Sequence, residues 1–162
     1  MASMDQEDER TTAVGLFHFA EAYRTCAEAL MRKPPRSLRF EDPMWLLAFH
    51  SLELYLKAYL RHHGVTPKKL RLEYRHRMVK LWDEAAAFGL TCQLDPRPML
   101  DVMDKGELLS LRYILTGSSW RPDAEQLMQF LEQLRHEVFS HLQGAGLPVR
   151  LEDAEANGWP RE

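Results

Sequence analysis

Hydrophobic residues surround nearly the whole circumference of the segment 45–60, WLLAFHSLELYLKAYL. At roughly 100° per residue, four polar or charged side chains of a helix over this segment share one sector about 80° wide: His50, Glu53, Lys57 and Arg61. A helix that is apolar on all sides is usually buried between other elements. The pattern therefore predicts a central helix whose polar stripe is paired, or faces a groove or a second subunit.

Apolar residues recur at helical spacing in four further segments, and no segment has the alternation of a convincing strand. The predicted helices cover about Thr12–Met31, Asp42 to near Gly64, His76–Phe88, a stretch that starts at Asp95 and Pro96, and Asp123–Gln143. Asp42 is expected to cap the second helix, with Pro43 as its first helical residue. The fourth helix is expected to kink or break around Lys105 and Gly106.

Short connections between these segments favour antiparallel neighbours. The predicted fold is all-α, an up-and-down antiparallel bundle of about five helices. With 162 residues and 45% hydrophobic composition, the chain is expected to bury one ordinary core. We therefore predict a flexible acidic N-terminus at residues 1–11, the bundle at 12–147, and an extended C-terminal tail at 148–162.

Bulk charge gives no reason to expect tight binding to nucleic acid, because the net charge is −3 and the pI about 6.2. Any phosphate site must then be local. The acidic start MASMDQEDER argues against a secretory signal, and no apolar run approaches the roughly 18 residues of a membrane span. These observations predict a cytoplasmic protein without membrane contact.

Metal and disulfide sites are not expected. Cys26 and Cys92 are too few for a disulfide framework and are predicted to be buried thiols. His62 and His63 have no third ligand at a plausible spacing, and a histidine near a helix C-terminus is already favoured electrostatically. The sequence thus predicts no metal and no cofactor.

Three motifs together resemble the HEPN superfamily of small prokaryotic helical bundles. The motifs are LELYLKAYLRHHG, HRMVKLWDEAAAFGL and LRYIL, and the resemblance covers about Phe17 to His141. Its most telling parts are Glu53 and Lys57 in the second helix, His76 at the start of the third, and the ending from Ala85 to Leu90. The resemblance implies a bundle that dimerises and acts either as a metal-independent ribonuclease or as a non-catalytic partner. It also implies, for toxin and antitoxin-like pairs, a partner that is a minimal nucleotidyltransferase. This chain has no nucleotidyltransferase motif, so such a partner would be encoded separately.

Active members of that superfamily carry an arginine followed, after four to six residues, by a histidine on a late helix. Arg135, His136 and His141 in LRHEVFSH match this pattern. Histidine can transfer a proton at a ribose 2′-hydroxyl or the leaving oxygen, while arginine binds the phosphate. The alternative is a helix-terminal histidine and a solvated arginine, because Arg135 lies about 120° from His141 around an ideal helix.

Two groups of residues are candidates for binding. Glu53 and Lys57 form either a simple intrahelical ion pair or a polar patch that lines a dimer or ligand groove, with His50 one turn before them. The basic run 68–80, KKLRLEYRHRMVK, is either a phosphate-facing patch or a solvated loop and helix start. The candidates in the basic run are Arg75, His76, Arg77 and Lys80.

The sequence therefore favours a homodimeric, HEPN-like interaction module of a nucleotide- or RNA-linked system, of the toxin-antitoxin or defence type. A separately encoded nucleotidyltransferase and RNA are the expected partners. A metal-independent RNA endonuclease that uses Arg135 and His141 is the alternative. A purely structural oligomer is a third interpretation.

Overall fold

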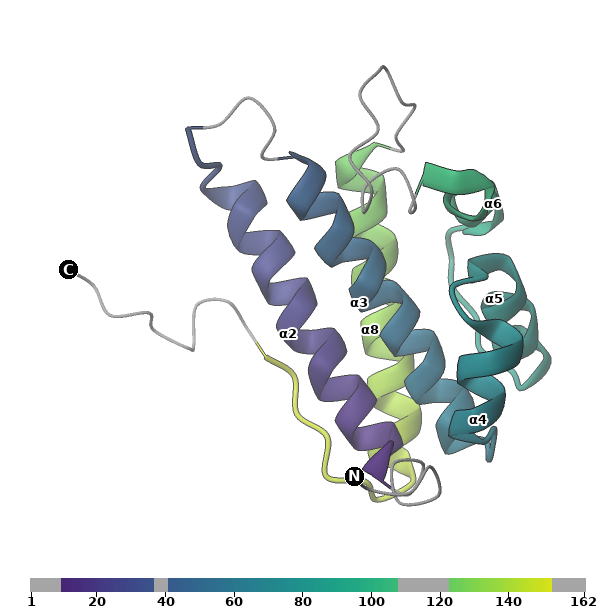
Figure 1. Ribbon diagram of the computed structural model, residues 1–162. Helices are drawn as coiled ribbons and strands as arrows, with labels where there is room; N and C mark the ends of the chain where they lie inside the picture. Colours follow the sequence, from purple (N-terminus) through teal and green to yellow (C-terminus); the bar gives the residue numbers. More distant parts are fainter. Residues whose placement is uncertain (1–9, 37–40, 108–122, 153–162) are drawn as a thin grey trace, which may run out of the picture.

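The computed structural model describes residues 10–36, 41–107 and 123–152, and within these ranges every regular element is helical (Figure 1). The elements are α2 (Ala13–Arg32), α3 (Glu41–His62), α4 (Pro67–Lys69), the π-helical turn η1 (Leu70–Tyr74), α5 (Met78–Ala87), α6 (Arg97–Val102), the π-helical turn η2 (Met103–Glu107) and α8 (Ala124–Gly144). The all-α prediction is confirmed for the described part of the chain.

Helix α3 forms the centre of the core, as its all-round apolar pattern predicts. It packs against α2, α5 and α8, and more than half of its residues are buried. The buried residues are Met44, Trp45, Ala48, Phe49, Ser51, Leu52, Glu53, Tyr55, Leu56, Ala58, Tyr59 and Leu60. Because partners surround this helix, a polar side chain on it needs a polar neighbour or a cavity.

Helices α2 and α3 run antiparallel along most of their length. The Ser51 hydroxyl donates to the Ala20 carbonyl at 2.8 Å, and further along α3 the Arg61 Nε donates to the Thr11 carbonyl at 3.0 Å. The contact partners thus move back along α2 as the chain moves forward along α3. This is the arrangement that the short connection between the two helices predicts.

Helix α8 also runs antiparallel to α2. Arg135 pairs with Glu21, and the Phe139 ring lies 6.1 Å from that of Phe17, one turn earlier in α2. Helices α3 and α8 therefore run in the same direction, as Figure 1 shows. The expected alternation of directions thus does not extend to this pair.

Several helix ends agree with the sequence prediction. Thr12 caps α2 by accepting from the Gly15 amide at 3.0 Å, and Asp123 caps α8 by accepting from the Gln126 amide at 3.0 Å. The predicted capping role of Asp42 is wrong, because Asp42 lies inside the first turn of α3. The break predicted around Lys105 takes the form of the π-helical turn η2.

The chain after α8 turns back and runs beside α2 (Figure 1). Gly146 ends the helix with φ +78°, a conformation that favours glycine. Val149 is buried, and the Arg150 amide donates to Nε2 of His18 at 3.3 Å. Residues 147–152 have no regular secondary structure, and Val149, Arg150 and Glu152 dock this segment on the bundle. The remaining predicted tail and the motif LRYIL lie outside the described residues.

Two further expectations concern the surface. None of the described helices combines the length and the apolar character that crossing a membrane requires.

The prediction of buried thiols is wrong for Cys26, which is exposed on α2, whereas Cys92 is half-buried. Burial, and then the charge of Glu137, raise the pKa of Cys92 to about 12, so this thiol is not activated as a nucleophile.

Candidate functional site

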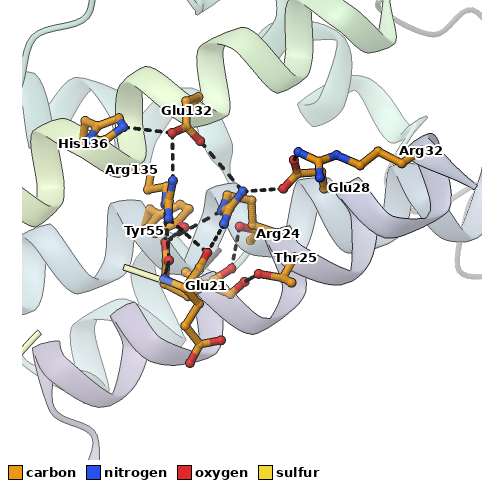
Figure 2. Close-up of polar contacts among 12 residues, drawn as sticks. Glu21, Arg24, Thr25, Glu28, Arg32, Tyr55, Glu132, Arg135 and His136 are labelled. Carbon is orange, nitrogen blue, oxygen red and sulfur yellow. Dashed lines mark hydrogen bonds and ion pairs between the residues drawn. The ribbon is translucent and has the colours of Figure 1, made fainter. Parts of the chain in front are cut away.

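Glu21 is the centre of a buried polar network that joins α2, α3 and α8 (Figure 2). Its side chain is fully buried, and its two carboxylate oxygens accept from Arg135 Nε at 2.9 and 3.2 Å. The Tyr55 hydroxyl also donates to this carboxylate. Burial, and then the charge of Glu21, raise the pKa of Tyr55 far above its ordinary value. Tyr55 therefore acts here as a fixed hydrogen-bond donor.

Arg135, the predicted phosphate-binding residue, is only 3% exposed. Besides the contact with Glu21, its Nη1 donates to Glu132 at 2.8 Å and its Nη2 donates to the Glu152 carbonyl at 3.0 Å. Burial opposes the charged form, but Glu21 and Glu132 hold the pKa of Arg135 above its ordinary value. The expectation of a solvated arginine is wrong, because all three guanidinium nitrogens bond to other parts of the fold.

The extended C-terminal segment completes this network. The Glu152 amide donates to Glu21 Oε2 at 2.5 Å, and the Glu152 carbonyl accepts from Arg24 Nη2 at 2.5 Å. Arg24 also donates to Glu28 at 2.9 Å. The backbone N–H and C=O of Glu152 are thus held by a carboxylate and by two guanidinium groups, respectively.

Among the described residues, the charges in the network are balanced. The ion pairs connect three carboxylates, those of Glu21, Glu28 and Glu132, with three guanidinium groups, those of Arg24, Arg32 and Arg135. A balanced network gives no excess of positive charge that would attract a phosphate. The simplest role for it is to fix α2, α8 and the C-terminal segment relative to one another.

The structure separates the residues of the predicted catalytic motif into two environments. His136 is exposed, and its Nε2 lies 2.9 Å from Glu132, which also binds Arg135. His141 instead contacts the Tyr59 ring at a centroid distance of 5.1 Å and the His63 ring at 6.4 Å. Arg135 and His141 therefore have no partner in common among the contacts described here.

His63 is the most enclosed histidine of this second environment. Its ring stacks on Phe88 at 4.9 Å, with an interplanar angle of 19°, and lies 4.5 Å from that of Tyr59. Burial lowers the pKa of His63 below its ordinary value of 6.5, and the neighbours His62 and His141 lower it further. The sequence indicated no metal site at His63 and accounted for it as a histidine near a helix C-terminus. It missed the contact with His141 because the two residues are far apart in the chain.

Acid should destabilise the protein through His63. Above pH 6.5 this imidazole is neutral in both the folded and the unfolded state, so its contribution to stability is complete. As the pH falls below 6.5, the unfolded chain binds a proton more readily than the folded chain, and stability is lost. We expect the free energy of unfolding in urea to fall by up to about 1 kcal/mol between pH 7.5 and 5.5.

The matched variant His63→Phe keeps the aromatic contacts and removes the titrating group. Its unfolding free energy should change less over the same pH range than that of the wild type. His136→Gln, at an exposed position, is the control and should retain the wild-type dependence. Identical pH profiles for the wild type and His63→Phe would contradict this assignment.

A cavity of about 590 Å³ lies on another side of α3, between the start of α2 and the segment from α4 to η1. The predicted binding residues His50, Glu53, Lys57, Arg75 and His76 all line it, and the sequence analysis did not single out Thr11 or Arg71, which line it as well. The carboxylate of Glu53 contacts Lys57 Nζ at 2.5 Å and His76 Nδ1 at 2.9 Å. Burial opposes ionisation of Glu53, but Lys57 and His76 together hold its pKa below its ordinary value.

The two other predicted binding residues lie outside the cavity. Arg77 is exposed and directly precedes α5, and Lys80 Nζ lies 5.1 Å from the centre of the Tyr74 ring. The basic run is therefore divided between the cavity wall and the outer surface. Within the described residues, no group of three or more histidine, cysteine or acidic side chains is arranged to hold a metal ion.

Comparisons with known proteins found no matching family model, no matching curated protein and no matching solved structure.

Proposed function

We propose that this chain is a HEPN-like interaction module of a nucleotide- or RNA-linked system, and that it binds its partners without cleaving RNA. The observation that supports this proposal best is the position of Arg135, which is buried and bonded to Glu21, Glu132 and Glu152. In the proposal the module forms a homodimer and works with a separately encoded minimal nucleotidyltransferase.

Catalysis by Arg135 would carry a large energetic cost. A ribonuclease that used Arg135 would need its guanidinium to bind the scissile phosphate. Glu21, whose side chain is fully buried, would then lose its main ion pair. Breaking a buried pair of this kind costs about 3–5 kcal/mol. Interactions made in the transition state would have to offset this cost before they could accelerate cleavage.

Cleavage of a labelled, mixed-sequence RNA by the purified protein in EDTA tests the proposal. We expect no cleavage by the wild type. Cleavage by the wild type that is lost in His141→Ala would overturn the proposal and favour a metal-independent ribonuclease. His18→Gln is the control, because it removes an imidazole from α2, outside the predicted catalytic motif.

The outer face of α2 supports the homodimer part of the proposal. Phe19, 64% exposed, lies on this face with Ala22, Cys26 and Ala29, which are also exposed. The intervals of three and four residues align these side chains along one side of the helix. The outward side of α2 is therefore apolar, while its inward side carries buried Glu21. A second copy of the same face would cover this stripe.

Phe19→Glu should convert the dimer into a folded monomer. A carboxylate at this position would be buried without a partner in the interface, but it would face solvent in the monomer. Size-exclusion chromatography with light scattering measures the mass, and circular dichroism checks the fold. Leu94→Glu, at an exposed leucine outside α2, should remain dimeric. A Phe19→Glu dimer of wild-type affinity would exclude this face as the interface.

A further inference from the structure

We propose that the cavity beside Glu53 is the docking site of the acidic segment 1–9 of the same chain. Residues 1–9 lie outside the described ranges. Their sequence is MASMDQEDE, which has four carboxylates and no lysine or arginine. Docking of this segment requires neither RNA nor a second protein, so it goes beyond the proposed function.

The segment joins the bundle at the cavity itself. Thr11 lines the cavity, and its carbonyl accepts from Arg61 Nε of α3 at 3.0 Å, which fixes the chain at this point. Glu9 precedes Thr11 by two residues, and two extended residues span at most about 7 Å. The carboxylates therefore begin within reach of the cavity wall. A short covalent tether gives an effective concentration in the millimolar range, so weak individual contacts are sufficient for docking.

Arg75 offers the segment a guanidinium group without a carboxylate partner. Its side chain is exposed and lines the cavity, and its Nε donates to the Leu72 carbonyl at 3.3 Å. Within the described parts of the chain, no acidic side chain pairs with it. A guanidinium group has five N–H donors and matches a carboxylate with two parallel hydrogen bonds. Arg75 can therefore hold one carboxylate of the segment.

Lys57 and His76 are held in place before the segment docks. Both contact the carboxylate of Glu53, with Lys57 Nζ at 2.5 Å and His76 Nδ1 at 2.9 Å, and Glu53 is only 2% exposed. Lys57 retains further N–H groups, and His76 has a second ring nitrogen. A carboxylate of the segment can bind to these groups without the entropic cost of ordering them.

Exposed basic side chains beside the cavity extend its positive surface. The Arg77 amide donates to the Tyr74 carbonyl at 2.9 Å, and Lys80 Nζ lies 5.1 Å from the centre of the Tyr74 ring. Arg77 and Lys80 are exposed, and like Arg75 they have no ion pair with a described residue. Glu73 is the only acidic residue of the run 68–80. The attraction to the segment therefore extends beyond the cavity, and it should weaken as salt is added.

The backbone at Arg75 is an independent sign of a binding site. Arg75 directly follows the π-helical turn η1 and has φ +50° and ψ −113°. Within the described ranges, it is the one non-glycine residue with positive φ. Such conformations are most common at ligand clamps and functional sites, where π-helical turns are also frequent. The surrounding fold holds this backbone, because the Arg75 amide donates to the Leu70 carbonyl at 3.1 Å. The strained residue is thus the one that holds the segment.

Paramagnetic broadening of amide resonances in the full chain tests the inference. Cys26→Ser and Cys92→Ser remove the two native thiols, and a nitroxide is then attached at Ser3→Cys. We expect the nitroxide to broaden the amide resonances of Arg75 and His76. Neutralising the segment should reduce this broadening by roughly twofold or more, because only the tether then keeps it near the cavity. The neutralised segment carries Asp5→Asn, Glu7→Gln, Asp8→Asn and Glu9→Gln.

Arg75→Gln tests the cavity side and should reduce the broadening of His76 to a similar extent. Arg97→Gln is the matched control, because it removes the same charge from an exposed ion pair with Asp83 outside the cavity. It should leave the broadening unchanged. Equal broadening with the acidic and the neutralised segment would overturn the inference, as would unchanged broadening in Arg75→Gln. Mixed-sequence RNA that binds at Arg75 and His76 equally well with either segment would also overturn it, because a docked segment must compete.

Discussion

Arg135→Met should lower the free energy of unfolding by about 3 kcal/mol, because it removes one partner of a buried ion pair and leaves Glu21 with less compensation. For a chain of this size the thermal midpoint should fall by roughly 10 °C. Urea unfolding followed by circular dichroism measures the change. This expectation replaces the one for a solvated arginine, whose removal would hardly affect the melt.

A double-mutant cycle makes the test specific. In the double variant Glu21→Leu, Arg135→Met both charges are gone, so we expect it to be more stable than either single variant. Glu132→Gln is the matched control, because Glu132 binds the same guanidinium but is 44% exposed. Its loss should stay below about 1 kcal/mol. If the unfolding free energy lost in the double variant equals the sum of the losses in the two single variants, Glu21 and Arg135 do not form a buried pair.

Truncation after Gly146 should destabilise the bundle by about 3 kcal/mol or more. It removes buried Val149, worth about 1.5–3 kcal/mol. It also removes the backbone N–H and C=O of Glu152, which bond to Glu21, Arg24 and Arg135, and bonds to charged groups contribute about 1.5–3 kcal/mol each. Truncation after Ala154 is the control, because it keeps the Glu152 carbonyl in a peptide bond, and it should leave the unfolding midpoint nearly unchanged. Equal midpoints for the two truncations would show that the segment does not stabilise the bundle.

The helices and their order could be predicted from the sequence because hydrophobic spacing and capping residues are local. The central position of α3 followed from its all-round apolar pattern, and Thr12 and Asp123 marked helix starts correctly. The parallel direction of α3 and α8 could not be predicted in this way. It depends on contacts between residues far apart in the chain, such as that of Arg135 with Glu21.

In the candidate sites, too, local features could be predicted from the sequence, whereas contacts between distant residues could not. Glu53 and Lys57 are one turn apart in α3, so their pairing was predictable. His50 lies on the same side of α3, about one turn before Glu53, and it lines the same cavity. Arg135 matched a short motif, but its environment is set by Glu21, 114 residues away. The one local sign was that Glu21 and Arg24 occupy inward positions of α2, between Phe17 and Ala27. A short motif specifies which residues are present, whereas the fold determines whether their polar atoms are available.

The guanidinium of Arg135 is bonded to Glu21, Glu132 and Glu152, and we therefore propose that it does not bind a scissile phosphate. Nuclear magnetic resonance of the Arg135 Nε–H group in ¹⁵N-labelled protein tests this claim most directly. We expect a resonance that exchanges slowly with water, because the group is buried against Glu21, and that keeps its position when mixed-sequence RNA is added. A resonance that exchanges rapidly, or that shifts as RNA is titrated, would contradict the account and place Arg135 in an RNA-binding site.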